Sequence, residues 1–246
     1  MSARIWLVIP TYNEAENVGP IVHAVAEEMT KIAPGEYRIL IVDDNSPDGT
    51  GQLADKLAQE LTTVEVMHRT DKDGLGRAYI AGFEHVLAAG AELVVEMDAD
   101  FSHDPKYLGD LIAAADDADL VLGSRYVAGG AVSDWGVLRK LISRGGSFYA
   151  RAVLGIKVND LTGGFKCIRR HVLETIDLNS LRADGYVFQI EVTYRAICSG
   201  FKVREVPILF VDRAAGSSKM SGMIALEAML LVPKLRRHRA RQLTRS

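Results

Sequence analysis

Residues 93–105 read LVVEMDADFSHDP. A mostly apolar run, Leu93–Met97, ends abruptly in the acidic triplet Asp98-Ala99-Asp100, and a turn-forming segment then leads to Pro105. An apolar run of this length is typical of a strand that is buried on both faces of a sheet. The segment therefore predicts a buried strand with two carboxylates at its C-terminal end.

The first half of the chain repeats this alternation of a short apolar run with a longer stretch of helical spacing. Apolar residues three or four positions apart predict helices. Repeated strand–helix–strand units favour an α/β fold with a mostly parallel central sheet and helices on both faces. The strands are expected at Ile5–Ile9, Arg38–Val42, Val64–Met67, Leu93–Met97 and Leu120–Leu122, and the helices at Val18–Ile32, Thr50–Leu61, Gly74–Ala89 and Pro105–Ala115.

The second half is less regular, and no internal repeat or linker interrupts it. We expect a single domain over residues 1–246, with an apolar and then basic C-terminal segment, residues 220–246. Helices are expected at Val137–Leu154, Val187–Ser199 and Met220–Val232, a strand at Val203–Phe210, and loops at Asp160–Lys166 and Asp212–Lys219.

The composition is that of an ordinary globular protein, with 48% hydrophobic and 25% charged residues over a length of 246. It excludes a wholly disordered, collagen-like or disulfide-stapled chain. The two cysteines, Cys167 and Cys198, and the lack of a secretory signal favour the reduced cytoplasm. The first apolar run is too short for a signal peptide, and no stretch approaches the ~20 apolar residues of a membrane span.

Charge is distributed unevenly along the chain. The net charge is −3, yet the part from Lys234 to Ser246 holds six Lys and Arg residues and no acid, which leaves −9 on the rest. An acidic body argues against nucleic-acid binding. Because the basic part follows an apolar stretch, the segment suits a helix lying on a membrane surface over anionic headgroups. A terminal helix that packs on the core and ends in a solvated tail is the alternative.

The acidic pair at the end of the fourth strand is the strongest single candidate for chemistry. Carboxylates at alternate positions, here Asp98 and Asp100, can hold Mg²⁺ or Mn²⁺, which typically also bind substrate phosphates. A solvated acidic turn is the alternative reading. The position favours function, since open α/β sheets bind ligands beyond the carboxyl ends of their strands.

Polar clusters also follow the first two strands. Tyr12 could stack on a base and Glu14 could bond to it, while a carboxylate of Asp43-Asp44 could accept hydrogen bonds from a ribose or base. Ordinary helix capping by Asn13 or Asn17 and turn chemistry are the alternatives. The chain has neither the GxGxxG spacing after a strand nor a GxxxxGK[ST] loop, which argues against a Rossmann dinucleotide site and a P-loop NTPase.

Basic candidates come later in the chain. Arg125 follows a strand, Arg139 and Ser143 lie four positions apart and hence on one helix face, and Arg213 and Lys219 flank a polar loop. Guanidinium and ammonium groups can neutralise phosphates, and Arg can do so bidentately.

Other polar residues are expected to be structural. Surface ion pairs are the default for Arg144, Arg151 and Arg204, and His103 is expected to be solvated in its turn. Glu191 either faces the site or is an acid in the first turn of its helix, favoured by the helix dipole.

Several motifs taken together are far more specific than any one of them. Their combination resembles the inverting glycosyltransferases of family 2, which have the GT-A fold. Later segments narrow the resemblance to the dolichol- and polyprenol-phosphate mannose synthases, and it covers residues of about 5 to 220. The motifs are Pro10–Glu14, Val42–Thr50, Asp98-Ala99-Asp100 and Gly123–Tyr126, and the later segments are Arg139–Ser143, Asp160–Lys166, Gly185–Gln189 and Arg213–Lys219.

The resemblance implies how the donor would be held. Asp98, Ala99 and Asp100 would lie at the diphosphate and its metal ion. Family members often carry Gln as a further metal ligand where this chain has Ser102, a weaker ligand. The residues implied to hold the guanosine are Pro10, Tyr12, Glu14, Val42 and Asp44.

The resemblance also implies the acceptor side and the reaction. Arg125, Arg139 and Ser143 would meet the acceptor phosphate or the transferring sugar, and Arg213 and Lys219 would close over the phosphates. Mannose would pass from GDP-mannose to a polyprenyl monophosphate, with Mg²⁺ or Mn²⁺ as cofactor. The phosphate has a second pKa of about 6, so it is mostly a dianion at neutral pH and can attack without a general base.

The protein would then act by positioning and charge stabilisation, with Asp98, Asp100 and Arg125 as its catalytic residues. It would work peripherally on the cytoplasmic face of the membrane, alone or with a separate membrane-anchoring partner. The nearest alternatives are a polyprenyl-phosphate glucosyltransferase or another family 2 enzyme. A non-catalytic nucleotide-sugar-binding module is an alternative of another class, although it would not need the acidic pair.

Overall fold

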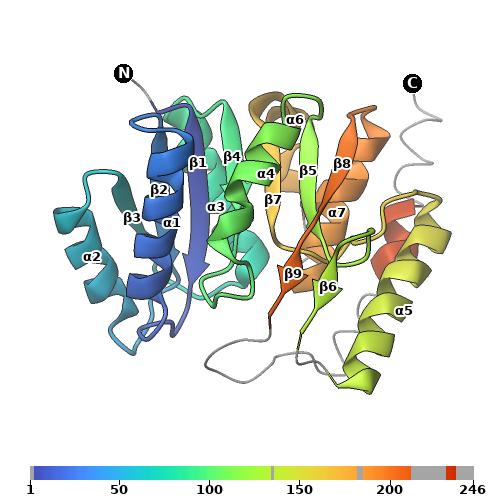
Figure 1. The fold of residues 1–246 in the computed structure, drawn as a ribbon, viewed down its shortest axis with the longest axis horizontal. Helices are drawn as coiled ribbons and strands as arrows, with labels where there is room; N and C mark the ends of the chain where they lie inside the picture. Colours follow the sequence, from blue (N-terminus) through green and yellow to red (C-terminus); the bar gives the residue numbers. More distant parts are fainter. Residues whose placement is uncertain (1–2, 134–135, 182–184, 212–230, 237–246) are drawn as a thin grey trace.

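A computed structural model describes residues 3–133, 136–181, 185–211 and 231–236 of the chain. Strands and helices alternate as expected, and the helices lie on both faces of a central sheet (Figure 1). The strands are β1 (Ile5–Thr11), β2 (Tyr37–Asp43), β3 (Val64–His68), β4 (Leu93–Glu96), β5 (Leu120–Ser124), β6 (Ala131–Val132), β7 (Lys166–Arg169), β8 (Val203–Pro207) and β9 (Leu209–Phe210). The helices are α1 (Val18–Ile32), α2 (Thr50–Glu60), α3 (Leu75–Ala88), the 3₁₀ turn η1 (Pro105–Tyr107), α4 (Leu108–Ala114), α5 (Val137–Leu154), α6 (Arg170–Thr175), the 3₁₀ turn η2 (Leu178–Ser180) and α7 (Gly185–Cys198).

Within the described residues the main sheet has seven strands in the order β3-β2-β1-β4-β7-β5-β8. Neighbouring strands are parallel except around β7, which runs antiparallel to both β4 and β5. The expected mostly parallel α/β sheet is therefore confirmed. Chain order reverses between β1 and β4, and such a switch point is where open α/β sheets bind ligands.

Two sequence-based expectations about the second half were wrong. The loop expected at Asp160–Lys166 ends one residue early, because Lys166 begins β7, a strand that the pattern did not reveal. The strand expected at Val203–Phe210 is two strands: β8 pairs with β5, whereas β9 pairs with β6 in a separate ribbon. The break follows Pro207, which cannot donate a backbone hydrogen bond to a continuing ladder.

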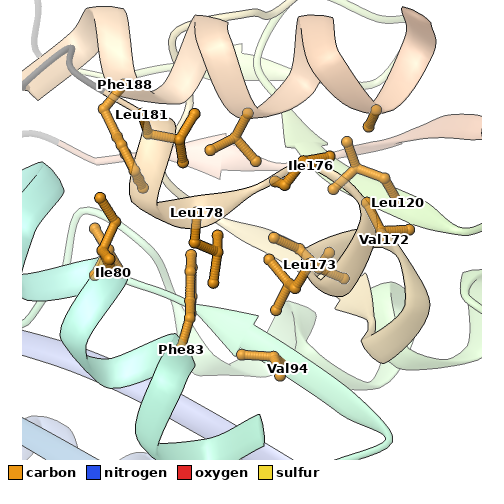
Figure 2. Close-up of a cluster of buried hydrophobic side chains, with 14 of the residues drawn as sticks. Ile80, Phe83, Val94, Leu120, Val172, Leu173, Ile176, Leu178, Leu181 and Phe188 are labelled. Atoms are coloured by element: carbon orange, nitrogen blue, oxygen red, sulfur yellow. The ribbon is translucent and has the colours of Figure 1, made fainter. Parts of the chain in front are cut away.

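The core lies in two layers, one on each face of the sheet. Strand side chains alternate between them: Leu7 faces the helices α1, α2 and α4, while Val8 faces α3, α5, α6 and α7. Figure 2 shows part of the second layer, where Phe83 of α3, Leu173 of α6 and Phe188 of α7 converge. Each such fully buried side chain contributes about 1.5–3 kcal/mol of burial free energy. This packing fixes α3 and α7 against the sheet, and both reach the candidate site.

The described end of the C-terminal segment packs on this second layer. Residues 231–236 are helical and lie beside α5 (Figure 1). Val232 is fully buried in the cluster, Leu235 packs against it, and Arg236 donates a hydrogen bond to the carbonyl of Val153 (2.8 Å). This part of the segment therefore follows the core-packing alternative. No helix in the described ranges is long and apolar enough to cross a membrane.

Candidate active site

The acidic pair lies just beyond β4, and its two carboxylates are held differently. Asp98 keeps 30% of its side chain exposed and accepts a hydrogen bond from the Tyr79 hydroxyl of α3 (3.3 Å). Asp100 is buried, and one of its oxygens accepts from both the backbone N–H (3.0 Å) and the hydroxyl (2.5 Å) of Ser102. Through these two hydrogen bonds Ser102 orients the carboxylate of Asp100.

These residues fit a hard divalent cation that has an open coordination sphere. Asp98 and Asp100 supply only oxygen ligands at alternate positions. No group of three or more His, Cys, Asp or Glu side chains suited to a metal occurs among the described residues. Two carboxylates without further acids suit Mg²⁺ or Mn²⁺, which complete their shells with water and substrate phosphates, rather than a closed structural zinc site.

His103 is buried, so the expectation of a solvated histidine was wrong. Its Nδ1 accepts the backbone N–H of Asp98 (3.2 Å), and its ring stacks on Phe165 with the ring centroids 5.1 Å apart. Burial lowers the pKa of His103 to about 4, so the ring is neutral at physiological pH. His103 therefore anchors the acidic loop, a role that only its three-dimensional surroundings reveal.

Three loops at this edge of the sheet each hold a non-glycine residue in the left-handed region. They are Asn13 after β1 (φ 57°), Asn45 after β2 (φ 56°) and Phe101 after β4 (φ 61°). Asn tolerates this conformation, but it is costly for a bulky residue such as Phe101. Strain of this kind concentrates at functional sites, where the surroundings impose it.

The residues expected at the nucleotide lie on the loops after β1 and β2, which end side by side because Thr11 pairs with Asp43. Asp44 is buried and forms an ion pair with Arg69; burial raises its pKa, with Arg69 acting in the opposite direction. Lys72 lies over the ring of Tyr12, with its Nζ 3.5 Å from the centroid. Sequence reasoning missed both Arg69 and Lys72, which follow β3.

The neighbouring polar groups are partly engaged in holding the loops. Asp43 accepts from the hydroxyl of Ser46 (2.5 Å), so turn chemistry accounts for this carboxylate. Glu14 accepts from the Asn17 side chain (2.8 Å). Pro10 and Val42 are buried at the ends of their strands and form the floor below these loops.

Arg125 is locked in a buried ion pair. Its Nε and one terminal nitrogen donate to the two oxygens of Asp160 at 2.7 and 2.6 Å, and the latter nitrogen also donates to Thr162 (2.8 Å). Burial works to raise the pKa of Asp160, but the charge and hydrogen bonds of Arg125 outweigh it and lower that pKa. In this geometry Arg125 fastens the loop that precedes β7.

Glu205 of β8 fastens the same loop from the other side. Its carboxylate accepts from the Ser124 hydroxyl (2.7 Å), the Asn159 amide (2.9 Å) and the backbone N–H of Asp160 (2.9 Å). The loop from Asn159 to Phe165 is thereby held between β5 and β8, at the edge where the acidic pair lies.

Tyr126 and Ser143 form the next part of the site. The Tyr126 hydroxyl and the Ser143 hydroxyl are 2.5 Å apart, and the guanidinium groups of Arg125 and Arg144 lie 5.3 and 5.6 Å from the Tyr126 ring. Two hydroxyls and the guanidinium of Arg144 therefore gather where β5 meets α5, beside Arg125, whose charge is paired with Asp160. Such a cluster suits a phosphate group.

Of the other two arginines expected in surface ion pairs, one forms such a pair within the described residues and one does not. Arg204 pairs with Asp117 (3.7 Å), as expected, whereas Arg151 donates to the side chain of Asn159 (2.9 Å). Glu191 lies in the second turn of α7 and pairs with Arg195 (2.6 Å), which gives it a structural role.

Phe210 packs between Arg125 and His103, which lies in the loop after β4 that carries Asp98 and Asp100. Its ring lies edge-on to His103, with centroids 5.5 Å apart, and 5.2 Å from the Arg125 guanidinium. Asp98, Asp100 and Arg125 therefore lie at the same edge of the central sheet. Arg213, Lys219 and the side chain of Arg139 lie outside the described residues.

Comparison with known proteins agrees with this arrangement. Residues 6–177 match the family model described as glycosyl transferase family 2. The polyprenol monophosphomannose synthase of Mycolicibacterium smegmatis is 50% identical over 231 residues, which are 93% of this chain and 85% of that protein. The undecaprenyl-phosphate mannosyltransferase of Micrococcus luteus is 46% identical over 231 residues, 94% of this chain and 93% of that protein.

Solved structures share the fold at much lower identity. Glucosyl-3-phosphoglycerate synthase from Mycobacterium tuberculosis superposes with a TM-score of 0.67 at 18% identity, over 95% of this chain and 80% of that one. A mannosyltransferase from Pyrobaculum calidifontis, in complex with GDP-Man and Mn²⁺, has a TM-score of 0.60 at 16% identity, over 99% and 75%. These matches show the GT-A fold alone.

Proposed function

Because this chain belongs to glycosyltransferase family 2, we propose that it transfers mannose from GDP-mannose to a polyprenyl monophosphate. The observation that carries the proposal is the near full-length identity, 50% and 46%, to two proteins named as polyprenyl-phosphate mannosyltransferases. A site with an acidic pair at a sheet switch point and a cluster of cations beside it suits a reaction between two phosphate-bearing substrates.

The donor would lie across the loops after β1, β2 and β4. Tyr12 offers an aromatic face for the guanine, and Glu14 and Asp44 offer carboxylates for base or ribose. Arg69 and Lys72 bring positive charge to the same loops. The buried Pro10 and Val42 would support the base through the backbone at the strand ends.

Asp98 and Asp100, with Ala99 between them, would hold the donor diphosphate through Mg²⁺ or Mn²⁺, with Ser102 near or at the ion. The cation would neutralise the charge that develops on the leaving diphosphate. His103 and Tyr79 hold Asp98 from its backbone and its carboxylate, which keeps the pair in place.

The acceptor phosphate would bind where β5 meets α5. Hydroxyls of Tyr126 and Ser143 and the guanidinium of Arg139 would hold its oxygens, while Arg213 and Lys219 would cover the phosphates. One phosphate oxygen forms the new bond to the anomeric carbon as the bond to GDP breaks, with inversion. The dianion needs no general base, and His103, neutral with Nδ1 occupied, is not placed as one.

The apolar and basic segment, residues 220–246, supports a peripheral position on the cytoplasmic face of the membrane, next to a lipid acceptor. A separate anchoring partner would strengthen this attachment. The same segment would complete a single catalytic domain spanning residues 1–246.

The proposal is tested by transfer of radiolabelled sugar to a polyprenyl phosphate from GDP-mannose or UDP-glucose, with Mg²⁺ or with EDTA. We expect labelled lipid from GDP-mannose and loss of product with EDTA. Asp100→Asn should reduce transfer by at least about 100-fold, because transition-state charge stabilisation is lost. Asp104→Asn is a matched control in the same loop, since Asn can still cap η1. Labelled lipid from UDP-glucose alone would assign the enzyme to glucose, and no product from either donor would overturn the proposal.

A further inference from the structure

A buried ion pair lies directly beneath the acidic pair. Glu96 of β4 and Lys166 of β7 occupy paired positions in the antiparallel ladder, and both side chains are fully buried. The Lys166 Nζ lies 2.7 Å from Glu96 Oε1. Lys166 also donates to the side-chain oxygen of Gln189, which comes from α7 and is itself only 2% exposed. No residue role assigned above uses these three side chains.

The ion pair fixes the orientation of the Gln189 amide. An ammonium group only donates hydrogen bonds, so it holds the carbonyl oxygen of the amide, and the NH₂ group must point the other way. In the described part of the chain, Nε2 of Gln189 and Oε2 of Glu96 are both buried without a hydrogen-bond partner, although the amide lies close enough to the Glu96 carboxylate to act on its pKa in the lowering direction. Buried donors are almost always paired, so an unpaired one needs an explanation.

The free amide group points at Gly164, opposite Asp98. Extending the ladder by two residues from the Glu96–Lys166 pair places Gly164 across from Asp98. A Cβ at Gly164 would lie 3.3 Å from Nε2 of Gln189 and 3.7 Å from each carboxylate oxygen of Asp98. Gly164 has no positive φ, so its backbone does not require glycine. The absence of a side chain at Gly164 leaves a small niche between Gln189 and Asp98. Because Gly164 is only half-buried, this niche is open to solvent at the site.

The walls of this niche select a neutral hydroxyl. An NH₂ donor stands on one side and a carboxylate acceptor on the other, and a hydroxyl can accept from the first and donate to the second. A phosphate oxygen would meet the negative charge of Asp98 at close range. A sugar hydroxyl therefore fits the niche better than any part of a diphosphate.

We propose that Gln189 recognises the transferring sugar by donating a hydrogen bond from Nε2 to one of its hydroxyl oxygens, in the niche left by Gly164. Lys166, neutralised by Glu96, is the positioning residue that turns the amide toward the sugar. This inference rests on the proposed function, because it requires a nucleotide-sugar donor at the acidic pair.

The test compares binding of GDP-mannose with binding of GDP, which lacks the sugar, by calorimetry in the presence of Mn²⁺. Gln189→Met keeps the size of the side chain and removes the amide. We expect it to weaken GDP-mannose binding by about 3- to 10-fold, the effect of one hydrogen bond to a neutral group, and to leave GDP binding within about twofold. Gly164→Ala, which fills the niche, should show the same selective loss.

Thr193→Val is the matched control, because Thr193 is fully buried one turn along α7 and, among the described residues, its hydroxyl donates to the backbone carbonyl of Gln189 alone. It should change neither affinity. Glu96→Gln combined with Lys166→Met removes both charges and leaves the amide free to turn, so it should also lower the GDP-mannose affinity selectively. Thermal unfolding of each variant shows whether it is folded.

The outcomes separate this inference from the proposed function. A Gln189→Met protein that keeps the wild-type ratio of GDP-mannose to GDP affinity and the wild-type kcat/KM would overturn the inference alone. Equal losses for both ligands would mean a structural role and would also overturn it. Wild-type protein that binds GDP but transfers no sugar from any nucleotide sugar would overturn the proposed function, and the inference with it.

Discussion

Asp160→Asn tests whether the buried ion pair with Arg125 stabilises the site. Asp160 is fully buried and Arg125 is 5% exposed, and two of the guanidinium nitrogens donate to the carboxylate. The substitution keeps the size of the side chain but removes its charge. Arg125 is then left as a buried cation that has lost the charge of Asp160.

The expected cost follows from this burial. Breaking a buried pair by removing one partner costs about 3–5 kcal/mol in the free energy of unfolding. For a protein of this length each kcal/mol lowers the Tm by about 2–4 °C, so a fall of about 10 °C is expected. The loss should occur at neutral pH, where Asp160 is ionised because its pKa is lowered. The wild type should lose stability as the pH falls below the ordinary aspartate pKa and through the lowered pKa of Asp160, because a carboxyl with a depressed pKa contributes its full stabilisation only above its unfolded-state pKa.

The assay is unfolding in urea and by heat, with Asp117→Asn as the matched control. Asp117 also pairs with an arginine, Arg204, but both side chains are more than half exposed. An exposed pair is worth at most about 1 kcal/mol, so the control should lie near the wild type. The double variant Arg125→Met/Asp160→Leu should be more stable than Asp160→Asn, since no charge is left unpaired. Equal stabilities of the two Asp→Asn variants would mean that the buried pair stabilises the fold no more than the exposed pair does, contrary to this prediction.

Three further outcomes are expected. Burial lowers the pKa of His103 to about 4. The wild-type protein should therefore lose up to about 3 kcal/mol of stability as the pH falls from ~6.5 toward 4, because the unfolded chain binds a proton that the buried ring does not. The Tm of His103→Gln should lack this pH dependence, and parallel plots of Tm against pH for the two proteins would contradict the prediction. Tyr126→Phe removes the hydroxyl that lies 2.5 Å from that of Ser143. The KM for the acceptor phosphate should rise about 3- to 10-fold, and the KM for the donor should be unchanged. A change in the donor KM would mean that Tyr126 does not lie at the acceptor phosphate. The double variant Arg237→Gln/Arg239→Gln should weaken binding to anionic vesicles by about 1 kcal/mol for each charge removed. Transfer to a short soluble acceptor should fall much less. Equal losses in the two assays would exclude a surface anchor.

Local signals in the sequence are enough to predict the general architecture and the place of the acidic pair. Apolar runs and helical spacing are local signals, so they predicted β1 to β5 and the helices between them. Parallel strands end at one edge of a sheet, so the position of Asp98 and Asp100 after β4 already placed them among the other polar loops. These inferences need only short-range pattern and the rules of parallel sheets.

The remaining features of the site depend on contacts between residues that are far apart in the chain. Lys166 meets Glu96 across 70 residues, and Arg125 meets Asp160 across 35. No periodic pattern marks β7, which is four residues long, and its antiparallel insertion beside β4 is what sets Gly164 opposite Asp98. The burial of His103, the engagement of Arg125 and the direction of the Gln189 amide all arise from such contacts. A side chain's partner sets its charge state and orientation, and that partner is chosen only when the sheet assembles.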